Sequence, residues 1–122
     1  MSPAAASQID RTFAALSDPT RRAVVDLLRK SPRRAGELAA ATAMSPPAMS
    51  RHLRVLRRTG LVEEDGLEHD ARVRLYRLRP EPFAALRRWV DQVEAFWAEE
   101  LDAFKAHAEG AATRRSATRS RR

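Results

Sequence analysis

The chain of 122 residues contains no cysteine, so it has no disulfide, no thiolate metal ligand and no cysteine nucleophile. It also lacks a long apolar run. Its longest uncharged stretch, residues 38–50, includes Pro46 and Pro47 and is far shorter than a membrane-spanning helix requires. Residues 1–8 have neither a basic start nor an apolar stretch, so we expect no secretory signal and a cytoplasmic location.

Sequence features of enzymes and metal sites are also scarce. There is no glycine-rich phosphate loop, no nucleophile motif, and no pairing of carboxylates beyond what exposed helix faces produce. The three histidines, His52, His69 and His107, fall on three different expected elements and lack the spacing of metal ligands. We therefore expect no catalytic residues, no metal site and no cofactor.

Charge is distributed unevenly along the chain, whose net charge is +7 and whose isoelectric point is about 11.2. Residues 11–58 carry eleven basic and three acidic side chains, and residues 113–122 carry five arginines and no acid. Residues 80–112 have the opposite sign, with three basic and seven acidic side chains. This pattern indicates a polyanionic partner such as nucleic acid or an anionic membrane. Arginine outnumbers lysine by 21 to 2, however, and a genome rich in G and C produces the same bias.

Two helices are expected near the N-terminus, after a flexible start over residues 1–8. The apolar residues of the first recur at helical spacing: Ile9, Phe13 and Leu16. The Asp-Pro pair at 18–19 is typical of a helix start, with an N-cap followed by proline in the first helical position. The Ser-Pro pair at 31–32 ends this second helix.

A short helix over about residues 35–42 and a longer basic one over about 45–59 follow. Only Ala43 and Met44 separate them, which is typical of a helix-turn-helix. The second of the two begins with another cap-plus-proline signal and ends at Gly60, the usual kind of residue just past a helix end.

Residues 61–63 and 72–78 are β-prone and predict a hairpin, or wing, with Asp65 and Gly66 between the strands. A long helix is expected over about residues 81–107, roughly 40 Å in length. Residues 108–122 lack large apolar side chains, and we expect them to form a disordered basic tail.

The apolar stripe of the last helix is too long for a chain of this size to cover. We interpret it as a dimer interface, and a helix that simply faces the core is the alternative. The candidate interface residues are Ile9, Phe13, Leu86, Trp89, Val90, Val93, Phe96, Trp97, Leu101 and Phe104.

The basic helix at 45–59 has two distinct faces when projected at 100° per residue. Met49, Leu53 and Leu56 share one face, and an arginine-rich face lies opposite. The first turns of such a helix reach base edges in the major groove, and arginine pairs well with guanine. The plausible base readers are Pro47, Ser50, Arg51 and Arg54. The alternative is a charged face that is merely solvated.

Other candidate DNA contacts are less direct. Arg58 lies far along the helix and would meet phosphate, and the helix start at Ser45 would offer free N–H groups to another phosphate. His52 flanks the apolar side, so a half-buried structural role is the first interpretation and a DNA contact the second. Arg72 and Arg74 share one face of the wing and would reach phosphate or the minor groove, although the acidic wing tip opposes this.

Several segments together resemble the ArsR family of bacterial winged helix-turn-helix regulators, over about residues 9–107. The matching segments are Asp18-Pro19-Thr20-Arg21-Arg22, Gly36-Glu37-Leu38-Ala39, Ser45 to Leu53, Leu56, Gly60-Leu61-Val62 and Tyr76-Arg77-Leu78. The resemblance implies a mainly α fold with a hairpin wing, five helices, and a homodimer formed by the first and last helices. It also implies that the fourth helix enters the major groove of operator DNA. The positions that commonly touch DNA in the family are here Ser45, Ser50, Arg51 and His52.

The chain departs from the metal-sensing members of that family. Those members use a cysteine pair in the third helix or Asp and His ligands in the last, whereas this last helix has only His107. The long last helix is more similar to that of metal-free members of the family, whose genes often lie beside genes for proteins of a START-like ligand-binding fold. We therefore expect a homodimeric transcriptional repressor that binds double-stranded DNA and has no membrane partner. The sequence leaves open whether its effector is a small molecule or a protein. A winged-helix module that binds only proteins is the alternative.

Overall fold

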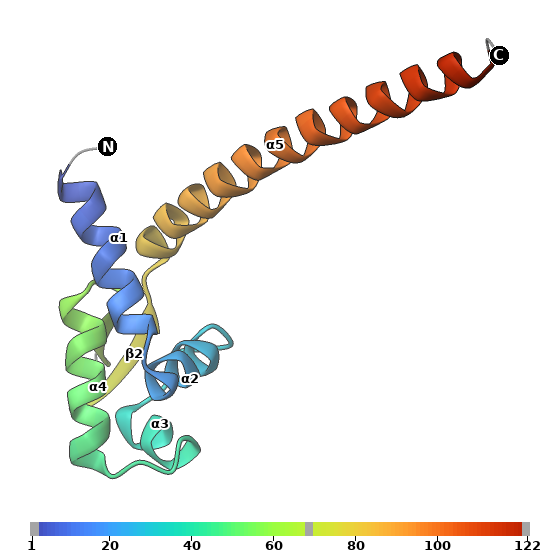
Figure 1. Ribbon diagram of the computed structural model, residues 1–122. Coiled ribbons are helices and arrows are strands. Elements are labelled where there is room, and N and C mark those ends of the chain that lie inside the picture. The colour runs from blue at the N-terminus through green and yellow to red at the C-terminus, as the bar shows by residue number, and fades with distance from the viewer. Residues whose placement is uncertain (1–2, 68–69, 121–122) are drawn as a thin grey trace. The chain divides into compact units, whose positions relative to one another are not determined.

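The computed structural model describes residues 3–67 and 70–120, which form five helices and one two-stranded antiparallel sheet. In chain order the elements are α1 (Pro3–Leu16), α2 (Pro19–Leu28), α3 (Ala35–Ala41), α4 (Pro46–Arg58), β1 (Val62–Leu67), β2 (Asp70–Leu78) and α5 (Pro80–Ser120) (Figure 1). Their order and type confirm the expected winged helix-turn-helix. The chain divides after Leu86 into two units, and the described part of the second consists of α5 alone.

Side-chain caps set the starts of α2 and α4, as predicted. The Asp18 carboxylate accepts a hydrogen bond from the backbone N–H of Arg21 at 2.9 Å, and a proline follows in the first helical position. The Ser45 hydroxyl accepts from the backbone N–H of Ala48 at 3.3 Å, again ahead of a proline. Proline is tolerated there because an N–H in the first turn has no partner within the helix.

The ends of α3 and α4 share one backbone motif but differ in the residue at its left-handed position. After α4, Gly60 has a φ of 81°, and the next N–H donates to the Leu56 carbonyl at 3.0 Å. After α3, Ala43 has a φ of 55°, and the next N–H donates to the Ala39 carbonyl at 3.0 Å. A residue with a Cβ atom is strained by about 1–2 kcal/mol in this conformation, whereas glycine is not. The turn between α3 and α4 therefore carries strain that the end of α4 avoids.

The core of the first unit draws its side chains from α1 to α4, from the residue before β1 and from the start of β1. Its apolar members, each at most 4% exposed, are Ala15, Val24, Leu28, Leu38, Ala39, Met49, Leu53, Leu56, Leu61 and Val62. The three from α4 are those predicted for its inner face. In Figure 1, α3 lies beside the N-terminal end of α4, the usual arrangement of a helix-turn-helix.

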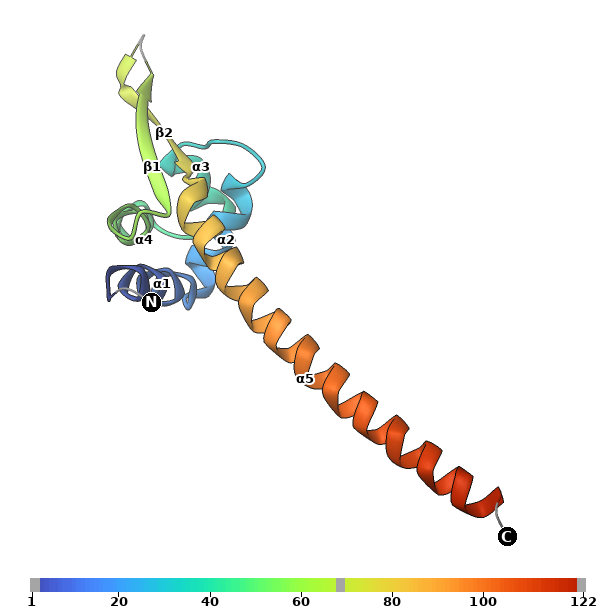
Figure 2. The ribbon, with the colours of Figure 1, turned by 90° about the horizontal axis from the view of Figure 1, so that it is seen from above.

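The wing is longer than predicted, and its connection lies elsewhere (Figure 2). Asp65 and Gly66, expected between the strands, lie inside β1, and Glu64 pairs with Tyr76 of β2. The strands are joined through residues 68–69, which lie outside the described residues. The expectation was wrong because the strand pairing continues past the Asp-Gly pair, and the Asp65 carboxylate forms an ion pair with an arginine of β2.

Backbone hydrogen bonds join the base of the wing to the helical core. The N–H of Tyr76 donates to the carbonyl of Arg33, between α2 and α3, at 2.8 Å, and the N–H of Arg33 donates back at 3.1 Å. The N–H of Arg79 donates to the Leu61 carbonyl at 2.9 Å. The wing is therefore anchored at its base by the segment that precedes α3.

Helices α1 and α5 are both longer than predicted. Helix α1 begins at Pro3, so residues 3–8 of the expected flexible start are helical. Helix α5 ends at Ser120, so residues 108–120, expected to be disordered, continue the helix. Both extensions are rich in alanine, and the second also in arginine, residues with high helix propensity that an analysis of apolar spacing does not count. The 41 residues of α5 span about 62 Å.

Candidate nucleic-acid interface

The exposed face of α4 carries the charge that a nucleic-acid surface requires. Its exposed residues include Pro47, Ser50, Arg51, Arg54 and Arg58. They lie opposite the buried Met49, Leu53 and Leu56, which confirms that the helix is amphipathic. No carboxylate whose side chain the structure describes forms an ion pair with Arg51, Arg54 or Arg58. One helix face thus presents three guanidinium groups to solvent.

The start of α4 does not offer the backbone donors that we expected. Pro46 and Pro47 have no N–H, and the N–H of Ala48 is bonded to the Ser45 hydroxyl. The N–H of Met49 donates to the Ser45 carbonyl at 2.9 Å. The expectation of free N–H groups for a phosphate was therefore wrong. The Ser45 hydroxyl still has its own proton to donate, since it acts as an acceptor within the helix.

His52 lies where α4 packs against the start of α2. Its ring, with the side chain 18% exposed, places Nδ1 3.8 Å from Oδ2 of Asp18 and 3.4 Å from Nη1 of Arg21. Arg21 is itself held by its Nε–H, which donates to the carbonyl of Ala15 at 2.7 Å. The backbone N–H of Arg21 lowers the pKa of the Asp18 carboxyl, because that hydrogen bond favours the charged form. His52 is therefore half-buried, with polar neighbours at the start of α2.

A nearly buried carboxylate lies where the wing meets α4. The side chain of Glu64 is 9% exposed, and its Oε2 lies 2.7 Å from Nη1 of Arg57 in α4. Its Oε1 lies 3.2 Å from Nε of Arg74 in β2. Burial, and after it the charge of Glu64, raise the pKa of the Tyr76 hydroxyl across the strand pair. One carboxylate therefore links α4, β1 and β2.

The other arginines at the base of the wing also have carboxylate partners. Arg77 lies 2.8 Å from Glu63 and forms a second ion pair with Asp65. Arg79 lies 4.0 Å from Glu63 and 3.6 Å from Glu81. Arg74, expected to reach phosphate, is thus one of several paired wing arginines. The side chain of Arg72, the other expected wing contact, lies outside the described residues.

Sequence reasoning missed Glu64 and Arg57, because neither lies in a recognisable motif. The available signal was the strand register, which places Glu64 opposite Tyr76 and on the same face as Arg74. That register cannot be deduced once the turn is placed at Asp65 and Gly66. Misplacing the turn therefore concealed the ion pairs as well.

Comparison with known proteins decides the family. A family model described as bacterial regulatory protein, arsR family, matches residues 18–64, from the N-cap of α2 into β1. The HTH-type transcriptional regulator Rv2034 of Mycobacterium tuberculosis is 40% identical over 95 residues, which cover 78% of this chain and 83% of that protein. The chain belongs to the arsR family.

Two further relatives of this arsR-family protein describe what such chains do. The transcriptional repressor SdpR of Bacillus subtilis is 36% identical over 56 residues, covering 46% of this chain and 62% of that protein. The homodimeric winged helix-turn-helix DNA-binding domain Mb0332 of Mycobacterium bovis superimposes with a TM-score of 0.61 at 29% identity, covering 82% of this chain and 93% of that one. The arsR-family protein is accordingly a transcriptional regulator of the winged helix-turn-helix class, and these relatives are regulators rather than enzymes.

Helix α5 of the arsR-family protein carries a series of exposed apolar side chains. Ile9, Leu86, Trp89 and Val90, also expected at an interface, are half-buried within the single chain. The exposed large side chains are Phe13 of α1, at 43%, and on α5 Val93, Phe96, Trp97, Leu101 and Phe104, at 36–72%. Phe96 and Trp97 contact each other edge to face, with ring centroids 6.4 Å apart.

Neither a metal cluster nor a membrane span is found in the described part of the arsR-family chain. No three or more His, Asp or Glu side chains gather there in a way that could hold a metal ion, and His69 lies outside that part. None of the described helices is both long enough and apolar enough to cross a membrane.

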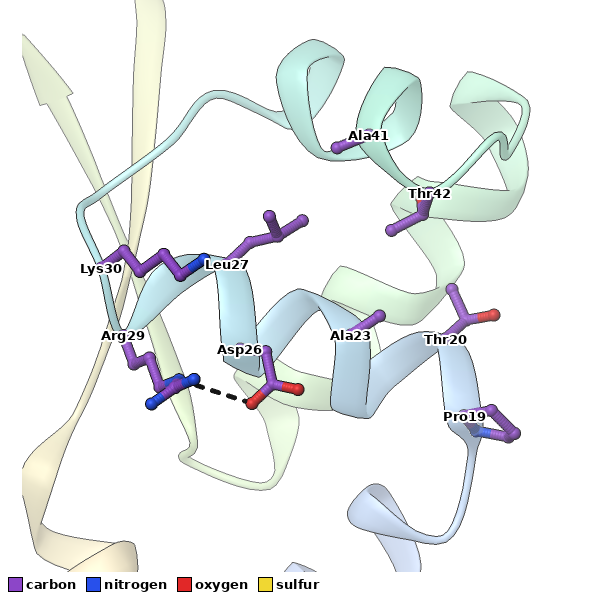
Figure 3. Close-up of a pocket in the computed structure, with 9 residues that line it drawn as sticks. All are labelled: Pro19, Thr20, Ala23, Asp26, Leu27, Arg29, Lys30, Ala41 and Thr42. Atoms are coloured by element: carbon purple, nitrogen blue, oxygen red, sulfur yellow. Dashed lines mark ion pairs between the residues drawn. The ribbon is translucent and has the colours of Figure 1, made fainter.

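A shallow pocket of about 500 Å³ lies on α2 and the end of α3 in the arsR-family protein (Figure 3). Thr20, Ala23 and Leu27 of α2 face Ala41 of α3 and its C-cap Thr42 across it. Asp26 and Arg29, on its outer side, form an ion pair at 3.6 Å. No lining residue belongs to α4 or to the wing, so this pocket is separate from the arginine face.

Proposed function

We propose that the protein is a homodimeric transcriptional repressor that binds operator DNA by placing α4 in the major groove. The observation that carries this proposal is the exposed α4 face with three guanidinium groups that no described carboxylate neutralises. A recognition helix needs free donors for base edges, and arginine supplies a bidentate pair for guanine. The family and the DNA-binding relative from Mycobacterium bovis support it.

The residues of α4 divide by their position along the helix. Pro47, Ser50 and Arg51 lie in its first two turns, from which side chains reach base edges, and Arg54 follows one turn later on the same face. Arg58 lies in the last turn, where a phosphate is the nearer target. The Ser45 hydroxyl has a proton left to donate to another phosphate. His52 acts through Asp18 and Arg21 by fixing the position of α4.

The dimer forms through the apolar face of α5, together with Phe13 and Ile9 of α1. Five large apolar side chains between Val93 and Phe104 are exposed in the single chain, and burying them in a second copy removes that area from water. The homodimeric relative supports dimerisation. Two α4 helices would then read two half-sites about one helical turn apart. Such a repressor would act in the cytoplasm.

The proposal is tested by mapping the DNA bound by the protein in its own cells and measuring binding to the recovered site and to a scrambled duplex. We expect preference for the recovered site, inverted half-sites, and a steep linear fall of log K with log salt. A protein-interaction module would show no sequence preference and little salt dependence. That result would contradict the proposal.

A further inference from the structure

The arginines around the C-terminal half of α4 fall into two groups. Arg54, Arg57, Arg58 and Arg79 line one surface hollow of about 540 Å³, together with Val62, Glu63 and Glu64. Arg54 and Arg58 have no described carboxylate partner, whereas Arg57 is held at 2.7 Å by Glu64. Adjacent residues of one helix, Arg57 and Arg58, therefore differ in whether their charge is available to a phosphate.

Glu64 holds its partners more firmly than a surface ion pair would. The carboxylate is 9% exposed, against 53% and 57% for the side chains of Arg57 and Arg74, and each of its oxygens has a different arginine partner. Exposed ion pairs contribute little to stability because water competes for both charges. Water competes much less for a carboxylate that is nearly buried. The two guanidinium groups are thus drawn toward the junction of α4 and the wing.

We infer that Glu64 limits the sequence-independent part of DNA affinity by keeping Arg57 and Arg74 off the phosphate backbone. Phosphate contacts strengthen binding to every sequence alike, so each arginine withheld from them lowers the affinity for operator and non-operator DNA by a similar factor. This inference rests on the proposed function, since it concerns the same DNA surface.

The decisive variant is Glu64→Gln, which leaves Arg57 and Arg74 without any described carboxylate partner. We expect affinity for the operator and for a scrambled duplex to rise by similar, several-fold factors and the slope of log K against log salt to steepen by about 1–2. Preference for the operator over the scrambled duplex should stay unchanged. A purely structural role for Glu64 predicts instead weaker binding to both duplexes, and that outcome would overturn the inference.

Glu63→Gln is the matched control, because it removes the same charge from the neighbouring position of β1. Its partner Arg77 keeps Asp65, and its partner Arg79 keeps Glu81. We expect the salt slope to change by less than about 0.5. If Glu63→Gln steepens the slope as much as Glu64→Gln does, net charge alone explains the effect and the inference is wrong.

Single arginine variants test the inference even if Glu64→Gln fails to fold, which circular dichroism would reveal. Arg57→Gln and Arg74→Gln should leave the salt slope nearly unchanged, whereas Arg58→Gln should make it shallower by about 1. A shallower slope in either of the first two would overturn the inference while leaving the proposed function intact. No salt-dependent binding by the unmodified protein would overturn both.

Discussion

Nδ1 of His52 lies 3.8 Å from Oδ2 of Asp18, so the recognition helix is joined through one side chain to the N-cap of α2. The same Oδ2 accepts the backbone N–H of Arg21, whose guanidinium lies 3.4 Å from the same imidazole nitrogen. Three polar groups, from α4 and from the start of α2, therefore lie close together at one site.

Asp18→Ala should destabilise the protein by about 1 kcal/mol near neutral pH, because it removes the cap of α2. The folded protein lowers the pKa of Asp18 from its ordinary value of 3.8, so the carboxylate stabilises the fold above that pH. Its contribution is lost as the pH falls through the lower folded value. The difference in the free energy of unfolding between Asp18→Ala and the unmodified protein should therefore become smaller as the pH falls from about 7 to about 3. Urea unfolding at each pH measures it.

Asp26→Ala is the control for this prediction, since its exposed carboxylate pairs only with Arg29 on the surface of α2. It should cost less than about 0.5 kcal/mol at both pH values. A difference in the free energy of unfolding between Asp18→Ala and the unmodified protein that becomes larger toward low pH would contradict the lowered pKa of Asp18.

Ala43→Gly should stabilise the protein by about 0.5–1 kcal/mol. It relieves about 1–2 kcal/mol of left-handed strain, and the greater freedom of glycine in the unfolded chain takes back about 0.5–1 kcal/mol. Gly60→Ala is the reverse change at the matching position of α4, where an added Cβ would meet no atom within 4 Å, so only the backbone would resist. The midpoint of thermal unfolding should be higher for Ala43→Gly than for the unmodified protein and lower for Gly60→Ala. The opposite order would show that Ala43 is not strained.

Replacing Val93 and Trp97 with glutamate should produce monomers or unfolded chains, because it places charges on the exposed apolar face of α5. Ala95→Glu, about half a helical turn from that face, should leave the oligomeric state unchanged. Analytical ultracentrifugation at micromolar concentration distinguishes the states. A monomeric unmodified protein would disprove the dimer.

Arg51→Ala or Arg54→Ala should cost about 1–3 kcal/mol on the operator and relax preference at particular base pairs. Deletion of residues 113–122, which carry five arginines, should instead weaken operator and scrambled duplexes by similar factors and make the salt slope shallower. Titrations of both duplexes at several salt concentrations distinguish base reading by the α4 arginines from phosphate contact by the tail. The division of roles is wrong if the deletion removes operator preference and the α4 variants keep it.

Stoichiometric zinc, nickel, cadmium or arsenite should leave operator affinity unchanged, since the chain has no cysteine and the described residues form no ligand cluster. Fluorescence anisotropy with each ion is a sufficient measurement. A change of about tenfold at one equivalent, or about 1.4 kcal/mol, would show that a metal regulates the protein.

Where the sequence predicted the structure well, the signals were local. The cap-plus-proline pairs and Gly60 fix helix ends through the backbone of a few neighbouring residues, and the spacing of Met49, Leu53 and Leu56 fixes the inner face of α4. The same spacing correctly singled out the exposed arginines on the opposite side of α4.

Where prediction failed, the deciding interactions join residues far apart in the chain or depend on propensity rather than pattern. Asp65 and Gly66 favour a turn locally, but cross-strand pairs hold them in β1. The partner of Arg74 is set by the strand register and by α4, neither of which its neighbours reveal. Residues 108–120 lack an apolar stripe yet continue the helix, because alanine and arginine favour it without tertiary contacts.

The two backbone hydrogen bonds between Tyr76 and Arg33 give the wing a gradient of stability along its length. At that level β2 has a partner on each side, β1 and the segment before α3, so the amide protons of Tyr76 and Arg33 are released to solvent only when the core opens. Toward Gly66, β1 is the only described partner of β2, and those amides exchange through local fraying instead. Hydrogen exchange should therefore be slow at the base of the hairpin and faster toward its far end, so that the far part of the wing opens without the core opening.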